Sequence, residues 1–161
     1  MLAAMTARQV ASVLLLCGLS AGATAATLSI TEFEDLDFGQ LSPSVDRARE
    51  RVRVCVNMDP AGPYQLTGFG TGSGGAFALT DGTGRHTVGL EVRINAPQLR
   101  RGPRELTPGV PLTGLSARPP RPNGNCGRSR VRVLVELRAE DLRQVPAGAY
   151  SGVLELTVAP E

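Results

Sequence analysis

Short runs of this chain alternate hydrophobic with polar residues. In the stretch RVRVCVN, Val52, Val54 and Val56 fall on one face and arginines fall on the other. The stretch RVRVLVEL, residues 130–137, repeats the pattern with a hydrophobic residue at every second position. A period of two is typical of a β-strand with one buried face, so both stretches predict half-buried strands.

The end of the sequence carries the same signal. In AGAYSGVLELTVAPE, Leu154, Leu156 and Val158 fall on one face, whereas Glu155 and Thr157 fall on the other. We therefore expect the last element to be a strand with one apolar face. That face needs neighbouring strands to cover it, and no further strand follows in the sequence.

Weaker alternation predicts several more short strands. They are expected over residues 27–33, continuing after a kink at Glu34–Asp35 into 36–39, and over 64–70, 75–80, 86–95 and 110–116, the last as an edge strand. DGTG, residues 81–84, predicts a hairpin turn; 41–50 and most of 96–127 are expected to be loops, and 139–144 a single helical turn. With 19 glycines and 12 prolines to make turns, these strands indicate an all-β protein, an antiparallel β-sandwich, with a closed barrel as the alternative.

The first residues have the composition of a secretory signal peptide. Arg8 precedes an apolar run that is too short to span a bilayer, and small residues follow it. We expect cleavage between Ala25 and Ala26, which leaves residues 1–25 as the signal peptide and 26–161 as one domain. An uncleaved membrane anchor is the alternative.

The predicted mature chain has two cysteines, Cys55 and Cys126. An exported chain with an even number of cysteines favours a disulfide, although two buried free thiols would also fit. Cys55 shares the face of the neighbouring arginines, so the bridge is expected at the surface or the end of a sheet. No metal site is expected, because His86 is the only histidine and no CxxC occurs.

No motif predicts catalysis. Glu32, Glu34, Asp35 and Asp37 cluster in the sequence, but acidic residues on a strand usually form a solvated face. His86 stands beside the predicted hairpin turn, and there is no GxSxG motif. The glycine-rich GFGTGSGG lacks the lysine and the helix of a phosphate loop. We expect neither an enzyme nor a cofactor nor a small-molecule substrate.

The alternating arginines allow two interpretations, polyanion binding or protection of a sheet from aggregation. A net charge of +2 and the absence of a recognised motif argue against nucleic-acid binding. Arginines alternate in RARERVRV and again in RSRVRV. They could bind a polyanion, or they could keep a sheet soluble and discourage pairing at its edge.

Four stretches, taken together, resemble the spore coat protein U domain family, which includes the subunits of archaic chaperone–usher pili. They are LDFGQLSPS, RVRVCVN, PYQLTGFGTG and the closing VPAGAYSGVLELTVAPE. The chain departs from the family pattern in having no cysteine in its first strand, and in having Gly152 where an aspartate is usual. The disulfide pattern of the family's major subunits therefore does not carry over.

The resemblance implies an immunoglobulin-like sandwich that lacks its last strand. Its partners would be a periplasmic chaperone, an outer-membrane usher and neighbouring pilus subunits, which fill the resulting groove by β-strand addition. The residues expected at this groove are Leu28, Ile30, Leu154, Leu156 and Val158, with Val52, Val54 and Val56 in the core behind them.

The start of the predicted mature chain suggests a position in the fibre. A polymerising subunit needs about ten spare residues before its first strand, because an extended chain rises only about 3.3 Å per residue. Here ATLSI leads almost at once into the first strand. We expect a subunit that accepts a strand without donating one, as a minor or tip subunit would.

The sequence thus predicts a structural subunit of a surface fibre, exported through the periplasm. The alternative is a secreted binding module with a complete sandwich, which would bind a carbohydrate or a polyanion by itself.

Overall fold

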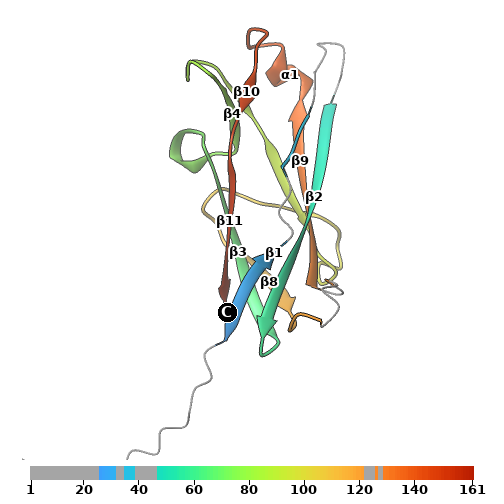
Figure 1. The fold of residues 1–161 in the computed structure, drawn as a ribbon. Helices are drawn as coiled ribbons and strands as arrows, with labels where there is room; N and C mark the ends of the chain where they lie inside the picture. The colour runs from blue at the N-terminus through green and yellow to red at the C-terminus, as the bar shows by residue number, and fades with distance from the viewer. Residues whose placement is uncertain (1–25, 32–34, 39–46, 122–125, 127–128) are drawn as a thin grey trace, which may run out of the picture.

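Antiparallel strands make up most of the computed structural model, which describes residues 26–31, 35–38, 47–121, 126 and 129–161. The strands form three separate sheets rather than one closed sheet (Figure 1). This arrangement confirms the predicted all-β sandwich.

The largest sheet has the strand order β1-β2-β9-β6-β7. Its strands are β1 (Thr27–Thr31), β2 (Arg47–Asp59), β9 (Arg130–Arg138), β6 (Glu91–Asn95) and β7 (Arg104–Glu105). The central ladder joins β2 to β9 and runs from Arg47 opposite Arg138 to Cys55 opposite Arg130.

The facing sheet has the order β11-β3-β8, and a third, small sheet has the order β10-β4-β5. The strands of the facing sheet are β11 (Leu154–Pro160), β3 (Gly62–Gly70) and β8 (Leu112–Ala117). Those of the small sheet are β10 (Tyr150–Ser151), β4 (Ala78–Asp81) and β5 (Thr87–Gly89). As predicted, β8 is an edge strand.

The core lies between the two larger sheets and is built from the alternating residues. Val54 and Val56 on β2, Leu66 on β3, Ile94 on β6 and Val133 on β9 are completely buried. Removing a side chain of this size from water stabilises a fold by about 1.5–3 kcal/mol. The inward faces predicted from the period of two are confirmed.

Two predicted strands are each divided in the structure. The run 86–95 gives β5, which pairs with β4, and β6, which pairs with β9. Between them the amide of Leu90 donates to the carbonyl of Phe77. The last strand is likewise divided at Gly152, where the chain leaves β4 and begins to pair with β3.

The expectation of a loop over residues 41–50 is wrong for its second half, because β2 already begins at Arg47. Residues 39–46 lie outside the described part. Arg47 and Arg49 stay in the strand because both reach Glu136 of β9, with N–O distances of 2.7 and 2.9 Å. A partner 87 positions away is not visible in the local pattern.

The predicted turns are confirmed. The hairpin between β4 and β5 closes with the Gly84 amide on the Asp81 carbonyl, at 3.0 Å, and Gly84 has a positive φ of 72°. The glycine-rich stretch is not a hairpin loop: it connects β3 to β4, which belong to different sheets, and it contains the short helix η1 (Ser73–Gly75). The helical turn is α1 (Ala139–Leu142).

A disulfide joins Cys55 to Cys126 at the end of the β2–β9 ladder. It lies at the end of the sheet, as expected, but not on its surface, since the two residues are only 2% and 6% exposed. The outward face of β2 is therefore covered at this point, and the bridge ties the segment before β9 to β2.

We expect Gly152→Ala to destabilise the protein by about 1–3 kcal/mol, since overpacking typically costs this much. A Cβ atom at Gly152 would lie 2.4 Å from the Ala78 carbonyl oxygen, so the backbone would have to shift. Urea unfolding would measure the change. Gly89→Ala is the control, because a Cβ atom there meets nothing within 4 Å. Equal stability of the two variants would contradict the prediction.

Replacing Cys55 and Cys126 together with alanine should lower the free energy of unfolding by roughly 4 kcal/mol, the chain-entropy value for a loop of this length. A reductant should destabilise the wild-type protein and leave the double variant unchanged. Alkylation of both cysteines in the unreduced protein, seen by mass spectrometry, would show that the bridge does not form in solution.

Candidate functional site: the edge between the first and last strands

The last strand, β11, is paired on one side only. Its ladder with β3 runs from Leu154 opposite Gly70 to Pro160 opposite Tyr64. No described strand pairs with its other edge. The backbone N–H and C=O groups along that edge can therefore bond only to solvent or to an added strand.

The first strand, β1, borders the same side of the sandwich. It pairs with β2, from Thr27 opposite Asp59 to Thr31 opposite Cys55, and with no other described strand. β1 and β11 approach each other near the end of β11, although they form no ladder (Figure 1). The two large sheets are thus not joined by strand pairing along this side.

Hydrophobic side chains from both strands line this side. They pack against the core but remain partly exposed, unlike the completely buried residues behind them. We call them the edge cluster: Leu28, Ile30, Leu154, Leu156 and Val158. Leu36 and Phe38, in the described segment after β1, are partly exposed in the same way and were not part of the predicted set.

The three β2 valines of the predicted groove lie deeper than the edge cluster. Val52, Val54 and Val56 are at most 2% exposed. They form the core behind the edge cluster and offer almost no surface to an incoming strand. The alternating pattern predicted correctly that these side chains point inward, but it could not predict how completely they are buried.

The turn between β4 and β5 contains an aspartate–histidine pair. His86 Nδ1 lies 2.9 Å from Asp81 Oδ2, and the hydrogen bond from this ring holds the pKa of Asp81 well below its usual range. The Thr83 hydroxyl donates to the same carboxylate, and in the described chain no Ser, Thr or Cys side chain bonds to the ring. The pair therefore stabilises the turn.

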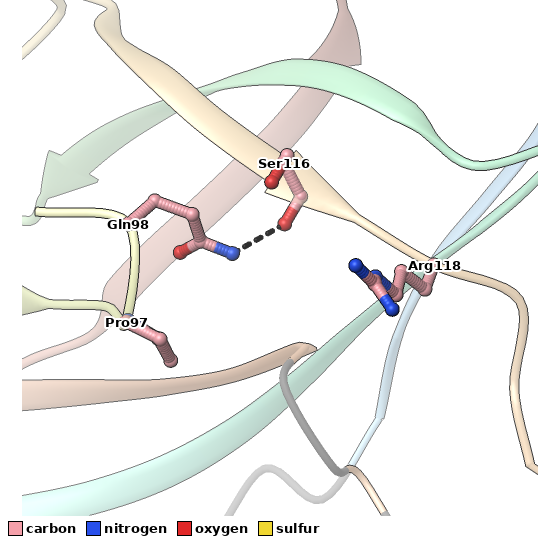
Figure 2. Close-up of a pocket in the computed structure, with 4 residues that line it drawn as sticks. All are labelled: Pro97, Gln98, Ser116 and Arg118. Atoms are coloured by element: carbon pink, nitrogen blue, oxygen red, sulfur yellow. Dashed lines mark hydrogen bonds between the residues drawn. The ribbon is translucent and has the colours of Figure 1, made fainter.

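A small cavity of about 260 Å³ lies between the loop after β6 and the end of β8 (Figure 2). Pro97, Gln98, Ser116 and Arg118 line it. Gln98 Nε2 donates to the Ser116 carbonyl at 2.7 Å and so ties the loop to the strand. These four residues include no carboxylate, histidine or cysteine.

Some residues with predicted roles lie outside the part of the chain that the structure describes. The signal peptide, residues 1–25, and the acidic residues Glu32 and Glu34 lie outside the described part. Within the part that is described, no group of three or more His, Cys, Asp or Glu residues could hold a metal ion. No helix in the same residues is long and apolar enough to cross a membrane.

Comparison with known proteins supports the fold. No family model matches the chain, and no curated protein sequence matches it either. The structure is similar to a chain in the complex described as "Chaperone-tip adhesin complex is vital for synergistic activation of CFA/I fimbriae biogenesis", with a TM-score of 0.59 and 14% identity. The match covers 83% of this chain and 41% of that one, so this chain spans less than half of its neighbour.

A second match is to a chain in the CsuC–CsuE chaperone–tip adhesion subunit pre-assembly complex, from archaic chaperone–usher Csu pili of Acinetobacter baumannii. Its TM-score is 0.47 at 14% identity, and it covers 83% of this chain and 40% of that one. At these identities the likeness concerns the fold alone, and the function has to be argued from this chain's own residues.

Proposed function

We propose that this chain is an exported structural subunit of a surface fibre, assembled by β-strand addition at the edge between β1 and β11. The observation that carries the proposal is the combination of an unpaired β11 edge with the partly exposed edge cluster beside it. An added strand would pair with the backbone of β11 and place alternate side chains on the edge cluster.

The physical gain from such an addition is large. Each large aliphatic side chain that becomes fully buried contributes roughly 1.5–3 kcal/mol, and the ladder sets the register. An edge of this kind left open is a site for aggregation. Its natural partners would therefore be a periplasmic chaperone that covers the edge before assembly, an outer-membrane usher and a neighbouring subunit. The fold similarity to chains of chaperone–adhesin complexes agrees with this role.

The beginning of β1 supports a terminal position in the fibre. Thr27 is already paired with Asp59, and Leu28 and Ile30 pack against the protein's own core. If the signal peptide is removed before Ala26, almost no residues remain to act as a donor strand. The proposed subunit therefore accepts a strand but has none to give, as expected at the tip.

A peptide of about ten residues with alternating apolar side chains should raise the melting temperature of the purified protein, because a ligand of the folded state stabilises it by mass action. At 100 times its Kd, the peptide should add about 2.7 kcal/mol, which corresponds to several degrees. Calorimetry with and without the peptide would measure the shift.

Two matched variants locate the binding site. Leu156→Asp should abolish the shift, because a charge would have to be buried beneath the added strand. Thr157→Asp adds the same charge on the exposed face of the same strand and should leave the shift intact. A wild-type protein that is monomeric, stable and indifferent to the peptide would instead have a complete sandwich, as a stand-alone binding module does.

Mixed with its chaperone and usher alone, the native chain should give capped single subunits and no homopolymers. Grafting a donor extension from a polymerising subunit before Thr27 should produce fibres, which electron microscopy would detect. The same graft combined with Leu156→Asp is the control and should not polymerise. Homopolymers of the ungrafted chain would overturn the terminal position while leaving strand addition in place.

A further inference from the structure

The outer face of the largest sheet is rich in arginine and divides into two halves. Near α1, every arginine that points outward has an acidic partner. Arg47 and Arg49 hold Glu136, which is only 5% exposed, and Arg93 and Arg138 both pair with Glu91. In this half each outward arginine is thus ion-paired, and the four arginines share Glu136 of β9 and Glu91 of β6.

The other half has no such partners. Arg51 and Arg53 on β2, with Arg130 and Arg132 on β9, form what we call the arginine patch. Arg51, Arg53 and Arg132 are exposed, and Arg130 is partly exposed. In the described part of the chain, none of the four forms an ion pair. The patch carries four positive charges in a chain whose net charge is only +2.

Two of these arginines stand directly opposite each other. Arg53 pairs with Arg132 across the ladder, and residues in such a position have Cβ atoms about 4.5–5.5 Å apart. Like charges directly opposite are destabilising. The sheet therefore keeps an unfavourable arrangement that Glu136 and Glu91 relieve in the other half.

Protection of a sheet edge does not account for the whole arrangement. The ladder of β1 covers only Cys55–Asp59 of β2, so Arg51 and Arg53 lie beyond its end. Arg132, however, is paired with Arg53 of β2 on one side and with Asn95 of β6 on the other, so its charge lies on no edge that it could protect from pairing. An external anion, on the other hand, would supply the negative charge that the described residues lack here.

We propose that the arginine patch binds an acidic polysaccharide through its sulfate or carboxylate groups. Arginine suits both, because its guanidinium group binds planar or tetrahedral oxyanions with two parallel hydrogen bonds. Side chains on one strand repeat every second residue, about 6.6 Å apart, so four arginines on two strands form a grid that an extended polyanion can cross.

The surroundings of the patch favour a polysaccharide over other polyanions. Leu134 lies between Arg51 and Arg93 in the outward row, and no aromatic side chain lies on the outward positions of β2 or β9. Proteins that bind single-stranded nucleic acids stack the bases on aromatic side chains, and elements that insert into a membrane surface carry exposed apolar side chains. The exposed Phe69 belongs to β3, in the other sheet.

The position of the patch is compatible with assembly. It occupies the outward face of β2 and β9, whereas the edge cluster lies on β1 and β11. A strand added beside β11 would leave the patch exposed. The inference therefore does not depend on the proposed fibre function, and either can fail without the other.

Binding of fluorescent heparin and of alginate fragments to the purified chain, measured over a range of salt concentrations, tests the proposal. We expect binding that weakens as salt rises, and about a tenfold loss of affinity in the double variant Arg53→Gln/Arg132→Gln, as two exposed charge contacts would give. Binding of heparin alone would identify sulfate as the ligand group, and binding of alginate alone would identify carboxylate.

Matched variants separate the patch from net charge. Arg85→Gln/Arg143→Gln removes the same two charges from exposed positions outside this sheet face and should bind like the wild type. Arg53→Lys/Arg132→Lys keeps the charge without the fork of donors and should bind with intermediate affinity. The glutamine double variant should also melt no lower than the wild type, because it relieves repulsion; a residue pair that served only the fold would lower the melting temperature.

Three results would overturn the proposal. The first is no binding of either polysaccharide at physiological salt. The second is an equal loss of affinity in the patch and control variants. The third is tighter, patch-dependent binding of a 20-base-pair DNA duplex than of either polysaccharide at the same salt, which would assign the patch to nucleic acid.

Discussion

The ladder between β2 and β9 is the interaction on which the other features of the fold depend. It pairs two long strands without a register shift, from Arg47 opposite Arg138 to Cys55 opposite Arg130. Because side chains alternate across a strand, this single register sends the valines of both strands into the core and the arginines outward. A slip of one residue would exchange the two sets, burying four or more charges, so the hydrophobic core and the charged face are fixed together.

The other ladders leave two strands of the described chain with a single neighbour each. β9 is paired with β2 and, from Arg132 to Glu136, also with β6, whereas the ladder between β1 and β2 covers only Cys55–Asp59 of β2. β1 and β11 each have one neighbour and meet on one side of the sandwich. The side chains there reflect the difference, since Leu28, Leu154 and Leu156 stay partly exposed while Val54 and Val133 are completely buried. The partly buried hydrophobic residues of β1 and β11 thus lie on the side of the sandwich where no ladder joins the two large sheets.

Local alternation was sufficient to predict the strands that carry the core, because the period of two is a property of each segment by itself. The prediction from local alternation failed where a residue far away in the sequence determines whether a segment forms a strand. Arg47–Glu50 reads as a polar loop and becomes a strand through Glu136, which stands 87 positions from Arg49. The division of the last strand at Gly152 depends on the approach of the Ala78 carbonyl, which the sequence cannot reveal.

The edge cluster was predicted more fully than the arginine patch, for a physical reason. Alternating hydrophobic residues on one face of a strand are stable only when another element covers that face. Leu154, Leu156 and Val158 therefore predict a covered or strand-binding surface from the local sequence alone. Alternating arginines allow no such prediction, because whether an arginine forms an ion pair depends on the residue opposite it in the sheet. Only the register shows that Arg49 faces Glu136 whereas Arg53 faces Arg132. The two halves of this face therefore differ: the arginines of one form ion pairs within the sheet, and those of the other leave unpaired positive charge on the β2–β9 ladder, where the proposed polysaccharide would bind.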